Sequence, residues 1–232
     1  MINLFKLHSK PETLLGYDRI IQIPKMAWEM TNEKQKRKMT NLWLKDPETA
    51  LRYATQVIEK RWPEAEPIIA KNAKYAYQYA NFFPGRFLEG EAAIATNPTF
   101  AYSYARHKIG GRWPEGEAAI ATDPDEALNY ADKIIKGPWP PGEAAIARDT
   151  YRAADYARFV LGKRWPPGEA AIVRDPIIAA YYAEDIIQGR FPLAEPGISR
   201  NRVAARYYAD RVLNDPNPET WAERYLASKK AK

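Results

Sequence analysis

The chain of 232 residues contains no cysteine, which excludes a disulfide framework and a thiolate metal site and leaves the redox compartment open. Only two histidines, His8 and His107, are present, and neither has a cysteine or an acid at metal-ligand spacing. No apolar run approaches the ~20 residues of a membrane span, and the N-terminus lacks the apolar stretch of a signal peptide. We therefore expect a soluble cytoplasmic protein with no metal, no cofactor and no membrane contact.

Catalytic motifs are also missing. Ser9 and Ser103 have no nucleophile elbow, triad or lysine arrangement around them, and no phosphate-loop lysine follows Gly110-Gly111. We expect a protein that is not an enzyme. An active site assembled from residues far apart in the chain is the alternative.

The positive net charge of +6 is not spread evenly. Residues 1–60 carry a net +4, residues 61–215 are neutral, and residues 216–232 carry +2. Since the central region is neutral, the net charge is weak support for nucleic-acid binding, although it does not exclude that function.

What the chain does contain is an internal repeat, marked by seven tyrosines that are each followed by alanine. These are Tyr53, Tyr79, Tyr104, Tyr130, Tyr156, Tyr182 and Tyr208, spaced 26, 25, 26, 26, 26 and 26 residues apart. A fixed period of this size indicates a stacked array of supersecondary units.

Each unit predicts a hairpin of two helices. In one of them the first helix begins at Pro114, and the second begins after the cap Asp123 and stops at Gly137. Gly110, Gly162 and Gly189 repeat this stop. Apolar residues of the second helix recur with the spacing of an amphipathic stripe, and Trp113, Glu117 and Ile120 share one face of the first helix. The residue directly before the repeated glutamate of the first helix is always small: Ala65, Gly90, Gly116, Gly142, Gly168 and Ala194. Glycine in a helix costs roughly 1 kcal/mol relative to alanine, so we expect a backbone packed close to its neighbour.

The predicted fold class is all-α: a right-handed α-solenoid of about seven stacked hairpins with capping helices at both ends. We expect an N-terminal helical cap over residues 1–45, the repeat array over 46–215, and a capping helix with a basic tail over 216–232. Apolar residues from Leu14 to Trp43 would supply the first cap, and Trp221, Tyr225 and Leu226 the second.

The phrase Arg-Trp-Pro-Glu-(Ala/Gly)-Glu-x-x-Ile, followed by Asp-Pro and Ala-x-x-Tyr-Ala, resembles short helical repeats of uncharacterised proteins encoded by bacteriophages and large DNA viruses. The resemblance covers roughly residues 46–215. It implies an α-solenoid of viral origin that acts on a host factor, and it carries no catalytic residue.

Three polar series recur with the repeat. We interpret the glutamates Glu66, Glu91, Glu117, Glu143, Glu169 and Glu195 as structural, each bonded to helix-start amides, a tyrosine hydroxyl or the arginine before the aromatic residue. Those arginines predict a ladder of ion pairs between repeats, broken at Pro138. The tyrosine rings are interpreted as core. A third series of cations could follow phosphates: Lys71, Arg148, Arg174 and Arg200.

We expect the chain to bind another macromolecule, with a protein as the first hypothesis. Positions that differ between units should carry recognition, because repeated residues are explained by stacking. The candidates are Gln78, Ser103, His107, Asn129, Lys133, Asp155, Tyr181, Asp185, Tyr207 and Arg211. The alternatives are a nucleic-acid-binding repeat that uses the cationic series and a self-associating subunit of a viral assembly.

Overall fold

The computed structural model describes residues 32–230, and no strand occurs among them. The chain is an all-α repeat solenoid built from adjacent helix pairs, which confirms the predicted fold class. It divides into two compact units, residues 1–110 and 111–232, which are described separately. The predicted apolar residues from Leu14 to Trp28 lie outside the described part.

In the first unit, α2 (Glu33–Trp43) precedes α3 (Pro47–Arg52), which continues as the π-helix η4 (Tyr53–Val57). Two hairpins follow. The first pairs α4 (Glu66–Ile69) with α5 (Ala73–Phe82). The second pairs α6 (Leu88–Ile94) with α7 (Pro98–Tyr104), which continues as the π-helix η5 (Ala105–Ile109).

The second unit contains four hairpins and a terminal helix. The pairs are α8 (Pro114–Ile120) with α9 (Pro124–Tyr130) and η6 (Ala131–Ile135), and α10 (Pro140–Ile146) with α11 (Thr150–Asp155) and η7 (Tyr156–Leu161). Next are α12 (Pro166–Ile172) with α13 (Pro176–Tyr182) and η8 (Ala183–Ile187), and α14 (Glu195–Ile198) with α15 (Arg202–Arg211). The chain then forms the 3₁₀ turn η9 (Pro218–Thr220) and α16 (Trp221–Lys230).

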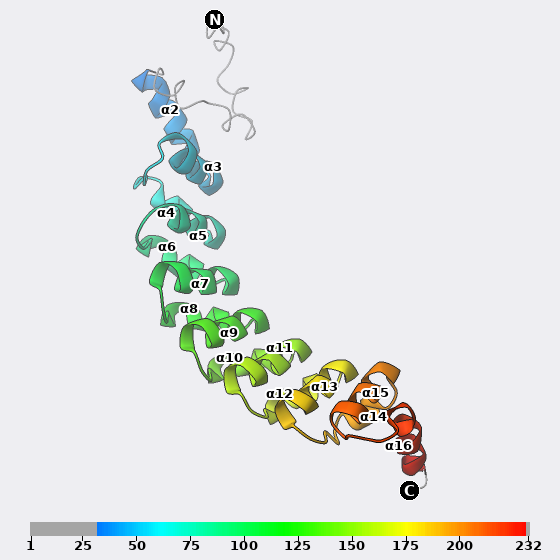
Figure 1. Cartoon of the computed structure of the whole chain (residues 1–232). Coiled ribbons are helices and arrows are strands. Elements are labelled where there is room, and N and C mark those ends of the chain that lie inside the picture. The colour runs from blue at the N-terminus through cyan, green and yellow to red at the C-terminus, as the bar shows by residue number, and fades with distance from the viewer. Residues whose placement is uncertain (1–31, 231–232) are drawn as a thin grey trace, which may run out of the picture. The chain divides into compact units, whose positions relative to one another are not determined.

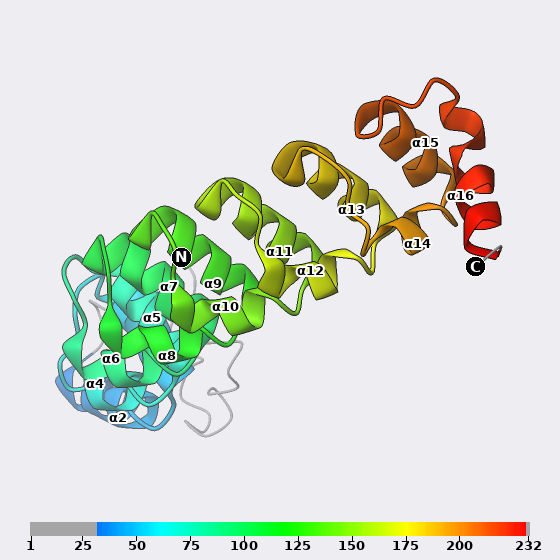
Figure 2. The same ribbon diagram turned by 90° about the horizontal axis from the view of Figure 1, so that it is seen from below.

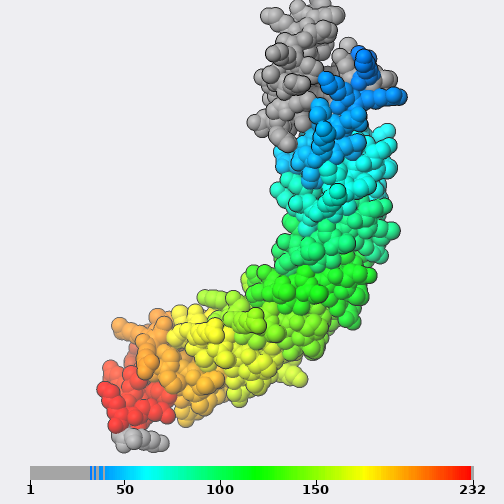
Figure 3. Space-filling view, turned by 180° about the vertical axis from the view of Figure 1, so that it is seen from behind, coloured from blue at the N-terminus to red at the C-terminus, as the bar shows by residue number. Residues whose placement is uncertain are grey.

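Within each unit the first helices of the hairpins line one side and the second helices line the other, in both Figure 1 and Figure 2. The surface of each unit changes colour in chain order, so each hairpin lies beside its neighbours in the sequence (Figure 3). A hairpin of this length cannot bury its own apolar stripe, and stacking on neighbours supplies the missing core.

The second helices begin where the sequence predicts. Their N-caps are extended residues whose side chains accept hydrogen bonds from amides of the first turn, as Asp123 does from the N–H groups of Asp125 and Glu126. The full set is Asp46, Asn72, Asn97, Asp123, Asp149, Asp175 and Asn201. Such a cap satisfies amides that the helix leaves free, and losing one costs about 1 kcal/mol.

The sequence pattern does not predict that most second helices widen into π-helices at the repeated tyrosine. The exception in the first unit is α5, which ends at Phe82 without a π segment. Pro84 explains the difference, because proline forces the preceding residue away from helical geometry, and Phe83 is extended with φ −95° and ψ 148°. The same unit contains the single 25-residue spacing, so the shorter link and the missing π-helix occur together.

Helix ends correct one prediction. The second helices stop at a left-handed residue six positions after the tyrosine, and in two hairpins this residue is the predicted glycine, Gly110 or Gly162. In two others it is Lys136 (φ 58°) or Gln188 (φ 54°), the residue before the expected Gly137 or Gly189. The left-handed turn therefore falls at a fixed distance after the tyrosine, whether or not a glycine stands there.

The repeated aromatic residues form the core. Tyr130 contacts Trp139 of the next hairpin with ring centroids 4.8 Å apart, and Tyr156 contacts Trp165 at the same distance. At the end of the repeats Trp221 takes this place on Tyr208 at 5.4 Å, which confirms the predicted capping helix. In the first unit Trp43 at the end of α2, 1% exposed, packs on Tyr53.

The small residues allow this packing. A Cβ added to Gly168 would lie 2.5 Å from the ring of Trp165 and 2.9 Å from Cβ of Ala153 on the previous hairpin. Gly142 and Gly90 are equally confined. Where alanine stands instead, at Ala65 and Ala194, the first helix is only four residues long and begins at the glutamate, three residues later than in the other hairpins.

Candidate functional site

A polar network inside each hairpin explains the glutamate and tyrosine series, and it has four parts in every hairpin except that of α10 and α11, which lacks the arginine. In the hairpin of α4 and α5, the Tyr79 hydroxyl accepts a hydrogen bond from the backbone N–H of Trp62 at 2.7 Å. The same hydroxyl donates to Glu66 Oε1 at 2.9 Å. Glu66 also accepts from Nε of Arg61 at 2.7 Å. This geometry ties the start of the first helix to the second helix, so the structural interpretation of the glutamates is confirmed.

The ion pairs correct the predicted ladder between repeats. Each pair joins an arginine to a glutamate five residues later in the same hairpin, as in Arg164–Glu169 (2.6 Å) and Arg190–Glu195 (2.9 Å). The pairs therefore close each hairpin on itself. Glu143, which follows Pro138, makes no ion pair among the described residues and retains the hydroxyl of Tyr156 at 2.8 Å.

Because the networks use the repeated polar residues internally, the residues that remain for a ligand are those that vary. Four of the ten predicted partner-binding residues come together on the second unit, around a groove of about 350 Å³ over α11, α13 and α15: Asp155, Tyr181, Asp185 and Tyr207. Arg158, Ile178 and Ile186 also line it. We call this feature the tyrosine groove.

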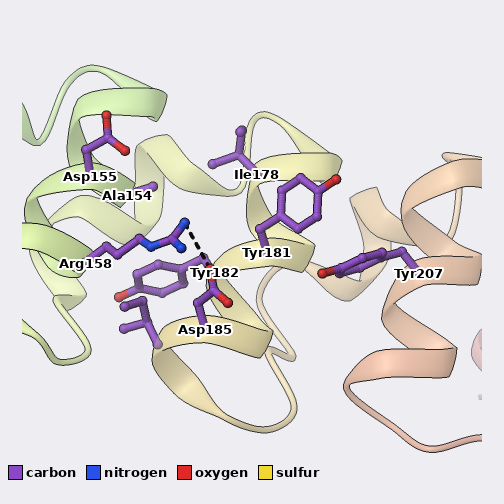
Figure 4. Close-up of a pocket in the computed structure, with 9 residues that line it drawn as sticks. Ala154, Asp155, Arg158, Ile178, Tyr181, Tyr182, Asp185 and Tyr207 are labelled. Atoms are coloured by element: carbon purple, nitrogen blue, oxygen red, sulfur yellow. Dashed lines mark ion pairs between the residues drawn. The ribbon is translucent and has the colours of Figure 1, made fainter.

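The side chains of the tyrosine groove are held by contacts between successive second helices (Figure 4). Tyr181 projects from α13 toward Tyr207 of α15, with ring centroids 4.7 Å apart and planes at 82°. On the opposite side Nη1 of Arg158 lies 3.2 Å from Oδ2 of Asp185. Rigid aromatic rings beside charged groups are typical of binding surfaces.

Behind the groove the Tyr207 hydroxyl donates to Glu184, and Nε of Arg211 lies 3.3 Å from Oε1 of the same carboxylate. Burial and then the hydrogen bond to Glu184 raise the pKa of Tyr207 to about 12. Tyr207 thus stays neutral and fixed at physiological pH. Tyr181 is 44% exposed, and its hydroxyl has no hydrogen bond within residues 32–230.

The other predicted partner-binding residues are not gathered into this groove. In the first unit Gln78 and His107 are exposed and Ser103 is half-buried. In the second unit Asn129 is half-buried, and exposed Lys133 pairs with Asp132 at 2.6 Å. Arg211 supports the groove through Glu184 without lining it.

The predicted cationic series is exposed throughout: Lys71, Arg148, Arg174 and Arg200. None of these side chains makes an ion pair with a described residue. Lys71 belongs to the first unit, whereas the three arginines belong to consecutive hairpins of the second.

Sequence reasoning missed Arg158, Ile178 and Ile186 of the groove lining, and the neighbouring Phe159. Arg158, two positions after Tyr156, lines the groove. The next residue, Phe159, is 61% exposed. The guanidinium of Arg158 lies 5.3 Å from the Phe159 ring centroid. Phe159 stands at the same register as His107, Lys133, Asp185 and Arg211, so a complete comparison of that position would have found it.

No group of three or more residues suited to hold a metal ion occurs in the described part of the chain. None of the described helices is both long and apolar enough to cross a membrane. No family model, curated protein or solved structure matches the chain.

Proposed function

We propose that this chain is a non-catalytic repeat protein that binds another protein through the tyrosine groove of its second unit. One observation supports this function most directly. Four residues that vary between hairpins, and that belong neither to the repeated core positions nor to the repeated polar networks, surround one groove. Repeat proteins commonly place variable side chains on a constant stacked scaffold to recognise partners.

The composition of the groove favours a protein over a small molecule. Tyr181 and Tyr207 offer amphipathic rings, Asp155 and Asp185 offer acceptors, and Ile178 gives an apolar floor. Tyrosine rings supply large contact areas with little loss of side-chain freedom, and the charged rim adds specificity. The resemblance to phage and viral repeats would make the partner a host factor, met in the host cytoplasm.

The test is capture of a partner by the tagged chain from nuclease-treated cell lysate, with identification by mass spectrometry. The groove variant combines Tyr181→Ser with Asp155→Asn, and the matched control is His107→Ala, exposed at the register of Asp185 in the other unit. We expect one stoichiometric protein that the control retains and the groove variant loses. Equal capture by both variants, or no capture, would overturn the proposal.

A nucleic-acid-binding repeat is the second candidate, because Arg148, Arg174 and Arg200 are exposed and make no ion pair with described residues. Each phosphate that a protein neutralises steepens the loss of affinity with salt. Binding to single-stranded DNA that falls steeply with ionic strength, and that the three Arg→Gln changes abolish, would favour this candidate.

A further inference from the structure

Three consecutive hairpins of the second unit carry an exposed arginine just after the first helix. Arg148, Arg174 and Arg200 each stand two residues beyond the end of α10, α12 or α14. Their side chains reach solvent without an ion-pair partner among the described residues. Their charge is therefore available to a ligand.

An exposed apolar side chain follows each arginine three positions later, in the first turn of the second helix. Tyr151 is 56% exposed, Ile177 37% and Val203 69%. Other hairpins carry polar residues at both positions, as in Lys71 with Lys74 or Thr122 with Asp125. Single exposed apolar residues are common, but three at the same register of consecutive hairpins form a repeated apolar series that a ligand can contact.

The first and second hairpins of this series are joined beside these residues. The Tyr151 hydroxyl donates to Oδ2 of Asp175, the residue after Arg174, at 3.5 Å. The Thr150 hydroxyl donates to the carbonyl of Ala171 at 2.9 Å, so the start of α11 lies against the end of α12. We name the six residues the arginine-apolar edge: Arg148, Tyr151, Arg174, Ile177, Arg200 and Val203.

We infer that the arginine-apolar edge binds an acidic protein segment in polyproline II conformation, with one apolar residue and one carboxylate in every three residues. The helix α11 packs against α13, and α13 against α15. Packed helices lie about 8 to 10 Å apart. A polyproline II chain repeats its side-chain direction every three residues, which at ~3.1 Å per residue is roughly 9 Å. The segment thus presents one apolar residue and one acid to each hairpin.

The chemistry of the edge favours a protein segment over nucleic acid. Single-stranded nucleic acids bind through bases stacked on aromatic rings, and two of the three apolar residues, Ile177 and Val203, are aliphatic. The capping carboxylates of Asp149 and Asp175 stand beside Arg148 and Arg174 in the chain and repel a continuous phosphate backbone. The spaced carboxylates of a protein segment, in contrast, can lie opposite the arginines without lying opposite the capping aspartates.

Fluorescence anisotropy of a labelled peptide of repeated Leu-Glu-Pro triplets, titrated with the full chain, tests the inference. Controls are a Leu-Glu-Pro-Gly peptide, whose period is four, a Leu-Lys-Pro peptide, and oligodeoxythymidylate. Two edge variants are needed: a triple Arg→Gln at positions 148, 174 and 200, and a triple change to Ser at positions 151, 177 and 203. The matched control variant is Lys71→Gln, which removes an exposed cation at the same register without an apolar neighbour.

We expect the triplet peptide to bind, and each edge variant to weaken it by about tenfold or more, which corresponds to ~1.4 kcal/mol. Lys71→Gln and the groove variant should leave this affinity unchanged. Binding at the arginine-apolar edge is thereby distinguished from binding at the tyrosine groove. Absence of binding, or equal affinity for the period-four peptide, would overturn the inference. So would oligodeoxythymidylate binding that depends on the arginines but not on the apolar residues. Circular dichroism of each variant verifies that it is folded.

Discussion

The hydroxyl of Tyr130 accepts a hydrogen bond from the backbone N–H of Trp113, seventeen residues earlier in the chain, at 2.9 Å. The same hydroxyl donates to Glu117 Oε1 at 3.0 Å. A helix that begins with Trp-Pro has free amides at its start, and this tyrosine satisfies one of them from the other helix of the hairpin. The relationship recurs in every complete hairpin and leads directly to the first prediction.

Tyr130→Phe should lower the free energy of unfolding by about 1 to 3 kcal/mol, because the buried N–H of Trp113 loses its acceptor. Chemical denaturation followed by circular dichroism measures the change. The control is Tyr151→Phe, an exposed ring, for which we expect a change within about 0.5 kcal/mol. Equal stability of the wild-type chain and Tyr130→Phe would show that water replaces the hydroxyl.

Alkaline pH should unfold the chain. Burial, the largest cause, raises the pKa of Tyr79, Tyr104 and Tyr130 to about 12, above the ordinary value of 10.0. The unfolded state therefore loses these protons first. Their contribution to stability is complete below pH 10 and is lost as the pH rises toward about 12.

Near-ultraviolet absorbance of tyrosinate, recorded together with helical circular dichroism, follows both events. We expect the buried tyrosines to ionise in the same transition that removes the helices. Ionisation of all tyrosines near pH 10 with intact helices would contradict the buried network.

Acid should weaken the same hairpins through the glutamates. The hydrogen bond from Arg112 lowers the pKa of Glu117, against the opposing effect of burial. Because the folded pKa is the lower one, this stabilisation is present above the pKa of the unfolded carboxyl and is lost as the pH falls through the folded value. Arg112→Gln should flatten the dependence of unfolding free energy on acidic pH. An unchanged slope would mean that Tyr130 alone holds the carboxylate.

Gly168→Ala should destabilise the chain by about 1 to 3 kcal/mol, the usual range for overpacking. The new Cβ meets Trp165 and Ala153 at distances that require a shift. The control is Gly137→Ala, where a Cβ meets nothing within 4 Å and φ is not positive. Thermal denaturation of the two variants should separate them clearly, and similar melting temperatures would show that the stack yields at little cost.

Lys136→Gly should stabilise the chain by about 1 kcal/mol, since the left-handed conformation costs a residue with Cβ roughly 1 to 2 kcal/mol. Gln188→Gly should act alike, and Gly162→Ala should act in the opposite direction. Denaturant titration of the three variants measures these changes. A loss of stability in Lys136→Gly would mean that the lysine side chain contributes more than its backbone strain costs.

The sequence predicts the elements whose causes are local. Asp123 caps its helix because its side chain reaches the next amides, and Pro114 opens a helix because its φ is already set. It does not predict the π-helices, because a helix that widens at its last turn keeps the same spacing of apolar residues in the sequence as an α-helix. The stop predicted at Gly137 is one residue late, because the left-handed turn falls six positions after Tyr130, at Lys136.

The candidate site is predicted in part. Comparing hairpins identifies Tyr181 and Asp185 as residues outside the repeated core set, and both line the tyrosine groove. Their meeting with Arg158 and Tyr207 depends on how successive second helices pack, which no single hairpin encodes. The sequence likewise does not distinguish Tyr151, Ile177 and Val203 from core residues, and only the structure shows that they are exposed.

Closure of the polar network inside each hairpin makes the hairpins interchangeable parts. Arg164, Glu169 and Tyr182 satisfy one another within one hairpin, and neighbouring hairpins are joined by rings, small residues, surface ion pairs and hydrogen bonds such as that from Thr150 to Ala171. A duplicated or deleted hairpin would therefore leave no buried charge without its partner. Surface residues such as Tyr181 can be moved from one hairpin to another without disturbing the buried network.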